Sequence, residues 1–291
     1  MRIPILCVGI FLAFSAFPAR AAPSCDDLVP FGLPTSPTSD VNVVTVCKKT
    51  TDGSTAYFIT HYDRNKVAPH WVAYALTRSE MLASATSGIT RKKDAVTFAR
   101  DPEIESDEFK SPTNATYTGI KAKGYDRGHY APADAMKWSR GAYRSTFTVS
   151  NIALQASAFN EGVWGALEVQ ERGWACDHDT IYSVTGVNFG SANSSFFRPR
   201  SSSTAHIAIP THFWKVVYTP TQGGKAVAFI FVNTKKAGSL ETAAVTVGHL
   251  EAMTGIDFMP ALAADVKSRI EAAELDTSFW RLDYPSNFVC H

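Results

Sequence analysis

Short apolar segments with the alternating pattern of β-strands recur along this chain, and few segments have a helical pattern. Strands are predicted at residues 41–48, 56–61, 71–76, 147–152, 181–185, 205–209, 213–218 and 226–232. Helices are predicted at residues 160–174, 245–254 and 261–275. Asp52-Gly53, between the first two strands, is typical of a hairpin turn. The pattern predicts an α+β fold, with a single domain whose mixed or antiparallel central sheet is flanked by helices.

The composition describes a packed globular protein. Of 291 residues, 45% are hydrophobic and 19% are charged, which excludes a disordered chain and a collagen-like one. The formal net charge is +1, from 28 Lys and Arg against 27 Asp and Glu. No global field therefore gathers polyanions, and any chemistry on nucleic acid must depend on a local basic site.

The first 21 residues have the pattern of a secretory signal peptide. Arg2 precedes an apolar run at residues 3–17, and Ala19-Arg20-Ala21 is a small-x-small cleavage pattern. The alternative is a membrane anchor, but a span needs about 20 apolar residues. We expect cleavage near Ala21, a secreted or periplasmic protein, and no stable membrane association afterwards. Residues 22–50 are then an N-terminal extension, and residues 51–291 form the main domain.

Four cysteines remain after this cleavage, and an exported protein can keep them as disulfides. Four cysteines allow three pairings. We favour Cys25–Cys47, which ties down the N-terminal segment, and Cys176–Cys290, which holds the C-terminus. A structural zinc site is disfavoured because the chain has no C-x-x-C pair.

The run from Gly124 to His129 contains the groups that phosphoryl transfer needs. A neutral His129 accepts a proton from water near neutral pH. Arg127 has the planar guanidinium that binds two phosphate oxygens at once. Taken alone, the four letters D-R-G-H favour a loop with a surface histidine over a catalytic site.

A second group of polar residues has helical spacing. Asn160, Trp164, Glu168 and Arg172 are four residues apart and therefore project from one broad face of a helix. Amide and carboxylate oxygens suit Mg²⁺, and a guanidinium suits an anion. The alternative is a solvent-exposed stripe in which Glu168 pairs with Arg172. Trp164 argues against that alternative, because a large aromatic side chain requires cover.

Together these segments resemble a known family. The runs "GYDRGHYAPADA" and "TVSNIALQASAFNEGVWGALEVQERGWA" are similar to the DNA/RNA non-specific endonucleases of the ββα-metal (His-Me finger) class, which include endonuclease G-like enzymes. The resemblance covers roughly residues 71–258. It implies that residues 51–291 are a DNA/RNA non-specific endonuclease domain with a ββα-metal active-site motif.

The resemblance also implies roles for single residues. His129 corresponds to the general base and Asn160 to the direct protein ligand of one Mg²⁺ ion. Glu168 corresponds to a carboxylate that holds metal-bound water and also contacts the metal. Arg127 and Arg172 correspond to arginines near the phosphate.

Two further positions stay open within the resemblance. Asn151 corresponds to the asparagine of the family's S-N-I run, where a catalytic role and a structural hydrogen bond are both compatible with the sequence. The family also uses an arginine upstream of D-R-G-H. Here Arg91 and Arg100 are candidates, and Lys92 or Lys93 is an alternative.

The implied activity is hydrolysis of DNA and RNA, without selectivity for the sugar, to products with 5′-phosphate ends. The implied cofactor is Mg²⁺, with Mn²⁺ as a substitute, and a homodimer is expected because the family includes dimers. Two alternatives remain at this level: a non-catalytic nucleic-acid-binding protein on the same fold, and a phosphodiesterase for a small substrate.

Overall fold

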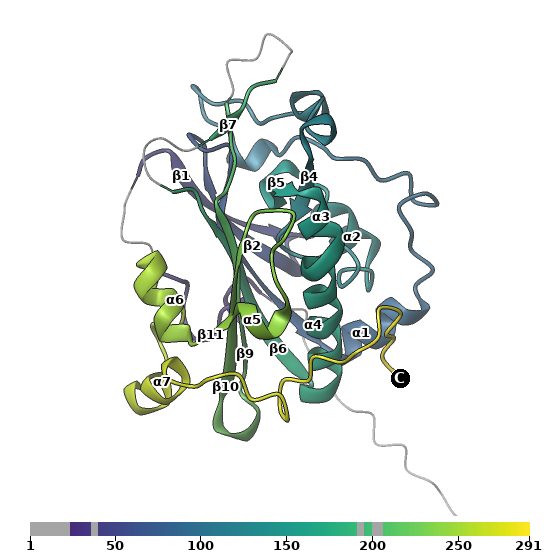
Figure 1. The fold of residues 1–291 in the computed structure, drawn as a ribbon. Helices are drawn as coiled ribbons and strands as arrows, with labels where there is room; N and C mark the ends of the chain where they lie inside the picture. Colours follow the sequence, from purple (N-terminus) through teal and green to yellow (C-terminus); the bar gives the residue numbers. More distant parts are fainter. Residues whose placement is uncertain (1–23, 36–39, 191–194, 200–205) are drawn as a thin grey trace, which may run out of the picture.

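The computed structural model describes residues 24–35, 40–190, 195–199 and 206–291. Its centre is a seven-stranded sheet in the order β1-β2-β3-β6-β9-β10-β11, in which every neighbouring pair is antiparallel. The strands of this sheet are β1 (Val43–Lys49), β2 (Ala56–Asp63), β3 (Ala68–Thr77), β6 (Thr180–Asn188), β9 (His212–Thr219), β10 (Lys225–Val232) and β11 (Ala244–Val245). The predicted α+β fold is confirmed (Figure 1).

Helices cover the central sheet on both sides (Figure 1). The α-helices are α1 (Arg78–Thr86), α2 (Arg140–Ser145), α3 (Ser157–Phe159), α4 (Gly165–His178), α5 (Leu240–Ala243), α6 (Val247–Thr254) and α7 (Ala264–Glu271). Two small sheets lie outside the large one and consist of β4 (Tyr125–His129) with β5 (Ile152–Ala156), and β7 (Phe196–Phe197) with β8 (Ile207–Ala208).

The alternation along β3 shows why both faces of the sheet are buried. Val72, Tyr74 and Leu76 join the hydrophobic cluster under α4. Trp71 and Ala73, which alternate with Val72 and Tyr74 along the strand, join the cluster under α6 and α7. Successive side chains of a strand point to opposite faces, so one strand supplies both clusters. The sheet is therefore the middle layer of three.

The ββα unit lies beside this sheet and begins with β4. It continues through β5 and then into a long helical segment from α3 to α4. His129, at the end of β4, pairs with Ile152, and Tyr125 pairs with Ala156. A third hydrophobic cluster, to which Ile152 and Leu154 belong, lies beneath the unit. The motif that the resemblance implied is thus formed by residues 125–178.

Two sequence predictions need correction. The predicted strand at 147–152 is wrong, because residues Val149–Asn151 form a 3-10 turn and the strand begins at Ile152. The predicted helix at 160–174 extends from 157 to 178 and contains a π-helical turn at Asn160–Trp164, where Gly162 departs from helical geometry (φ −102°, ψ −112°). The regular four-residue stripe is therefore interrupted between Asn160 and Glu168.

The structure contains both favoured disulfides, Cys25–Cys47 and Cys176–Cys290. The first joins the N-terminal turn to β1, and Leu28 and Phe31 beyond it pack against the sheet. The predicted signal peptide at residues 1–21 lies outside the described residues. In the part of the chain that the structure describes, no helix combines the length and apolarity that a membrane crossing requires.

Candidate active site

His129 is the last residue of β4 and lies at the centre of the candidate site. Its ring contacts Phe98, with the ring centroids 5.4 Å apart, and Phe147, with the centroids 5.1 Å apart. Its Nε2 atom is buried and has no hydrogen-bond partner among the described residues. The imidazole is therefore fixed by packing, with its Nε2 atom enclosed by protein.

Close packing behind β4 limits what can replace Gly128. A Cβ atom at this position would lie 2.0 Å from Oε1 of the buried Gln155 in β5. Such a contact is far inside van der Waals distance. The glycine of D-R-G-H thus allows β4 and β5 to pair tightly and keeps His129 at its place on the strand.

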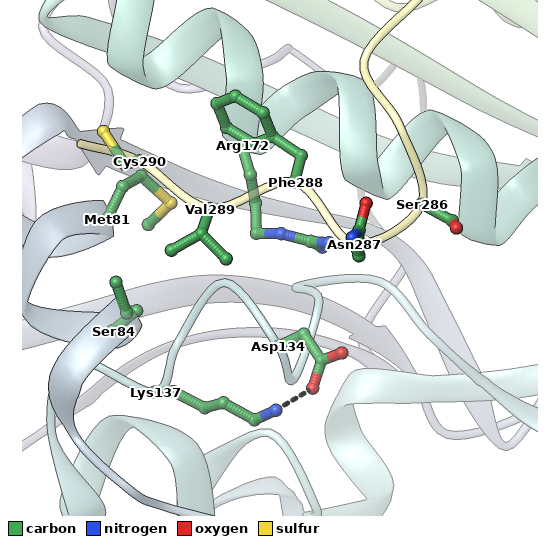
Figure 2. A pocket seen from close by; sticks show the side chains of 11 residues that line it. Met81, Ser84, Asp134, Lys137, Arg172, Ser286, Asn287, Phe288, Val289 and Cys290 are labelled. Atoms are coloured by element: carbon green, nitrogen blue, oxygen red, sulfur yellow. Dashed lines mark ion pairs between the residues drawn. The ribbon is translucent and has the colours of Figure 1, made fainter.

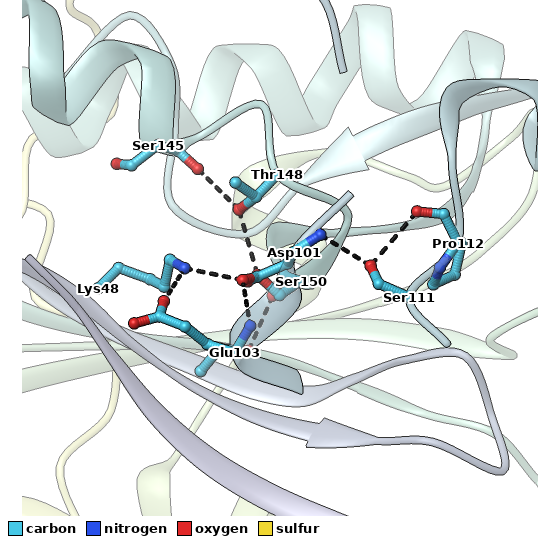
Figure 3. A network of polar contacts seen from close by, with 9 residues as sticks. Lys48, Asp101, Glu103, Ser111, Pro112, Ser145, Thr148 and Ser150 are labelled. Carbon is cyan, nitrogen blue, oxygen red and sulfur yellow. Dashed lines mark hydrogen bonds and ion pairs between the residues drawn. The ribbon is translucent and has the colours of Figure 1, made fainter. Parts of the chain in front are cut away.

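A buried polar network holds the long segment before β4 against the rest of the protein (Figure 3). Lys48 on β1 donates to Asp101 over 2.9 Å, and the Ser150 hydroxyl donates to the same carboxylate. The backbone N–H of Asp101 donates to Ser111 Oγ over 2.7 Å. Because Asp101 is completely buried, these bonds satisfy a group that would otherwise be costly. They fix the segment that carries Phe98.

Asn151 is fully buried, and its side chain is occupied by backbone groups. Oδ1 accepts from the N–H of Ala131 over 2.9 Å, and Nδ2 donates to the carbonyls of Ala131 and Thr146, each over 3.0 Å. These bonds join the turn before β5 to the chain just after His129. The geometry supports a positioning role for Asn151.

Three cationic or titratable groups surround the ring of Phe98. The guanidinium carbons of Arg127 and Arg91 lie 4.2 Å and 5.5 Å from its centroid, on a ring that also contacts His129. Arg127 donates to the side-chain oxygen of Asn114. Within the described ranges, neither arginine forms an ion pair with a carboxylate. The structure thus brings together His129, Arg127 and Arg91.

The other upstream candidates lie elsewhere. Arg100 forms an ion pair with Glu105. Lys92 and Lys93 are exposed on the turn after Arg91. Arg91 is therefore the upstream cation that the fold places beside the imidazole. Sequence spacing did not separate these candidates, because their placement depends on how the whole 87–124 segment folds over β4.

The surroundings keep His129 neutral. Burial lowers the pKa of His129 to about 4, and the charges of Arg91 and Arg127 act in the same direction. Burial and the proximity of Arg91 also lower the pKa of Arg127. Two arginines without a counter-ion next to a neutral base form a site that an anionic group would stabilise.

Asn160, in the π-helical turn, lies next to β4. Its Nδ2 donates to Asp126 Oδ2 over 3.2 Å. Although burial opposes it, hydrogen bonds from Lys121, Ser157 and Asn160 lower the pKa of Asp126, so this carboxylate is ionised. In the described chain no group donates to Oδ1 of Asn160. The bond to Asp126 therefore orients the amide and leaves its oxygen available.

Glu168 lies one turn before Arg172 on α4. Burial raises the pKa of Glu168 to about 7, with the negative charge of Glu171 adding to the effect and Lys215 opposing it. Arg172 Nη1 donates to the backbone carbonyl of Glu168 over 3.2 Å rather than to its carboxylate. The exposed ion-pair alternative is not what the structure shows. Trp164, the aromatic residue of the stripe, is completely buried.

These groups fit a hard divalent cation. The amide oxygen of Asn160 and the desolvated carboxylate of Glu168 both lack hydrogen-bond donors in the described part of the protein. The same part contains no cluster of three or more His, Cys, Asp or Glu side chains arranged to hold a metal. A site with few protein ligands, completed by water, is the coordination that Mg²⁺ prefers.

Sequence reasoning gave no role to Asp126 or Asp134. Membership of the D-R-G-H run was the sequence signal available for Asp126. The structure adds its hydrogen bond with Asn160. Asp134 follows His129 in a loop and pairs with Lys137. Burial lowers the pKa of His129 and raises that of Glu168, and the negative charge of Asp134 opposes the first shift and adds to the second.

The family model for DNA/RNA non-specific endonucleases matches residues 40–265. The chain belongs to this family. It is an enzyme that hydrolyses nucleic acids. Membership of this family argues against the alternative of a non-catalytic nucleic-acid-binding protein.

Relatives in bacteria and mammals are similar over most of the chain. A nuclease of Serratia marcescens is 30% identical over 90% of this chain and 92% of its own. Mitochondrial endonuclease G of Homo sapiens is 30% identical over 71% of this chain and 69% of its own. The fold matches a solved structure of an endonuclease G in complex with its inhibitor EndoGI, with a TM-score of 0.63, 23% identity, and 84% of this chain and 94% of that chain covered.

Proposed function

We propose that this protein is a secreted or periplasmic, Mg²⁺-dependent endonuclease that cleaves DNA and RNA to 5′-phosphate ends. The observation that supports this proposal most directly is the enclosed, neutral imidazole of His129 beside Arg91 and Arg127. A neutral base next to two unpaired guanidinium groups suits a phosphodiester and an attacking water. The proposed contacts are with phosphate oxygens, which DNA and RNA share, so we expect little selectivity for the base or the sugar.

In this proposal Nδ1 of His129 removes the proton from the attacking water, since Nε2 is enclosed by protein. Arg91 and Arg127 bind the phosphate and stabilise the charge that grows on its oxygens during in-line attack. Asn151 holds the chain after His129 and so keeps the imidazole in position. Asp126 orients the amide of Asn160.

Asn160 and Glu168 are the residues that would hold the divalent cation. When bound, such a cation supplies Lewis-acid polarisation of a phosphate oxygen and charge compensation for the leaving oxygen. Arg172, one turn along α4 from Glu168, contributes a further positive charge near the phosphate. Mn²⁺ is expected to replace Mg²⁺, because both accept oxygen ligands and octahedral geometry.

The direct test is digestion of supercoiled plasmid and of single-stranded RNA. With Mg²⁺ we expect both to be degraded to fragments that carry 5′-phosphate, and with excess EDTA we expect no degradation of either. Addition of Mg²⁺ in molar excess over the EDTA should restore the activity. Degradation that continues at full rate in EDTA, or products with 3′-phosphate, would rule out the proposed chemistry.

The low pKa of His129 predicts an unusual acid limit. The base stays neutral until the pH falls towards about 4, so protonation of His129 does not lower kcat/KM at pH 5.5. An unperturbed histidine would be only about one-tenth neutral at that pH. Arg91→Gln removes a charge that lowers this pKa, so the acid limb of the kcat/KM profile moves to higher pH.

Arg100→Gln is the matched control for this experiment, because Arg100 pairs with Glu105. Its acid limb should coincide with that of the wild type. The position of the limb, not the absolute rate, is the measurement, since Arg91 also contacts the phosphate in our proposal. An Arg91→Gln limb that stays in place or moves to lower pH contradicts the assigned environment of the base.

The organisation of the chain completes the proposal. Residues 1–21 are a cleaved signal peptide, residues 22–50 an extension that contains β1 and is closed by Cys25–Cys47, and residues 51–291 the endonuclease domain. Two disulfides support an oxidising compartment. Homodimerisation stays a prediction that the mass in solution checks.

A further inference from the structure

The C-terminal strap, residues 281–290, crosses the lower end of α4 and is fixed to it (Figure 1). Trp174 Nε1 donates to the carbonyl of Arg281 over 2.7 Å, and Gln170 exchanges two hydrogen bonds with the backbone of Tyr284. Gly173 allows this contact, since a Cβ atom there would lie 2.4 Å from the Tyr284 ring. The strap is a rigid wall along the helix that carries Glu168 and Arg172.

The end of the strap closes one side of a pocket of about 240 Å³ (Figure 2). Ser286 and Asn287 contribute polar side chains from the strap, and Arg172 crosses the pocket from α4. Lys137 and Asp134 face them from the loop that follows His129. The Cys176–Cys290 disulfide anchors the strap one helical turn beyond Arg172.

The charges of this pocket are unbalanced. Lys137 is paired with Asp134, with Nζ and Oδ1 2.5 Å apart. Arg172 donates to a backbone carbonyl of its own helix and, within the described chain, forms no ion pair. One guanidinium therefore faces an open polar pocket without a counter-ion. Arginine in this situation suits a phosphate group, which it binds through two parallel hydrogen bonds.

The pocket adjoins the catalytic groups. Arg172 lies one turn from Glu168 on the same helix. Asp134 and Lys137 line the pocket from the loop that follows His129, the last residue of β4. A phosphate bound beside Arg172 therefore lies on the face of α4 that also carries Glu168.

We propose that this pocket is a subsite for a backbone phosphate of the nucleic-acid substrate next to the phosphate that is cleaved. Arg172 is shared between the two phosphates, Lys137 offsets the negative charge of Asp134, and Asn287 donates its amide hydrogens to the neighbouring phosphate. The inference rests on the proposed nuclease function and extends it, because it predicts that substrates are gripped beyond the scissile bond by the C-terminal strap.

The test uses binding without turnover, so that it does not depend on catalysis. A fluorescein-labelled oligothymidylate of 12 nucleotides, ~12 being enough to span several phosphate contacts, is titrated with the full mature protein in EDTA, and anisotropy gives Kd. Lys137→Met/Asn287→Ala should weaken binding about tenfold, since a hydrogen bond to a charged group contributes roughly one order of magnitude. Both side chains are at least partly exposed, so the fold is kept.

Lys49→Met is the matched control, because it removes the same charge from an exposed position on β1. Its Kd should change less than twofold. Equal weakening in both variants would mean that only net charge matters and would overturn the subsite. Wild-type affinity in Lys137→Met/Asn287→Ala, the pocket variant, would overturn the subsite as well.

Two further arms separate the subsite from its alternatives. In Mg²⁺, the wild type should cleave trithymidylate at least tenfold more efficiently than dithymidylate, and the pocket variant should lose this ratio while cleaving dithymidylate normally.

Inorganic phosphate is the competitor that tests a free-anion site. If phosphate inhibits the wild type more than the variant while oligonucleotide affinity is equal in both, the pocket binds free phosphate and the proposal fails. If no substrate is cleaved but the binding difference persists, the nuclease mechanism fails and the subsite stands.

Discussion

His129→Ala is expected to reduce kcat/KM on plasmid DNA by about 10³-fold, within the 10²–10⁴-fold range that a general base contributes. The reason is specific to the site. Nε2 of His129 is enclosed and burial lowers the pKa of the ring to about 4, so His129 is a neutral proton acceptor at neutral pH. Among the described residues, no other histidine lies beside Arg91 and Arg127. Initial rates on plasmid, with melting temperature measured in parallel, provide the test.

The alanine leaves a void between Phe98 and Phe147, so a second variant is needed. His129→Gln fills more of that space but cannot act as a base, and it should be as inactive as His129→Ala. Imidazole in the buffer should restore part of the activity of His129→Ala only. His249→Ala, at an exposed position on α6, is the control and should keep full activity. A folded His129→Gln enzyme with wild-type activity would show that another group removes the proton.

The sequence was most informative where local pattern decides the structure. The hairpin of β1 and β2, the buried strand β3 and the helix that contains Glu168 all follow from alternation or from helical spacing. The π-helical turn at Asn160–Trp164 could not be predicted in this way, because it depends on how Asn160 meets Asp126 across the unit. Spacing alone placed Asn160 and Glu168 on a regular face that the chain does not form.

The predicted strand at 147–152 was wrong for a related reason. The segment is apolar enough for a strand, but Asn151 bonds to the backbone of Ala131 and Thr146 and turns the chain before β5. These partners are 20 and 5 residues away. The choice of Arg91 over Arg100 likewise depends on contacts that fold a long loop onto His129. Site residues could be proposed from the sequence, but their grouping required tertiary contacts.

Lys215 is the residue whose environment departs furthest from the sequence pattern. It lies in the middle of β9, an apolar strand, and is completely buried between the sheet and α4. Its ammonium pairs with Glu171, which is also completely buried, and donates to the Tyr74 hydroxyl over 2.7 Å. Glu171 further accepts from Ser183 over 2.7 Å. The network is satisfied only while both charges are present.

Lys215→Met is therefore expected to lower the free energy of unfolding by ~3–5 kcal/mol, because it leaves the carboxylate of Glu171 buried without a counter-charge. Replacement of both partners removes that penalty. The double variant Lys215→Met/Glu171→Leu should recover most of the lost stability, since an apolar pair of similar volume is often as stable as the buried ion pair it replaces. Urea denaturation with the disulfides intact gives the free energy of unfolding of the wild type, of Lys215→Met and of the double variant.

Lys49→Met is again the control, and on an exposed strand position it should change stability by less than about 0.5 kcal/mol. The double variant also separates stability from catalysis. Lys215 opposes the effect of burial on the pKa of Glu168, whereas Glu171 adds to it, so removal of both charges leaves a smaller net change at Glu168 than removal of Lys215 alone. If Lys215→Met and the double variant are equally unstable, lost packing rather than the uncompensated carboxylate accounts for the cost, and the ion pair is not what holds α4 against the sheet.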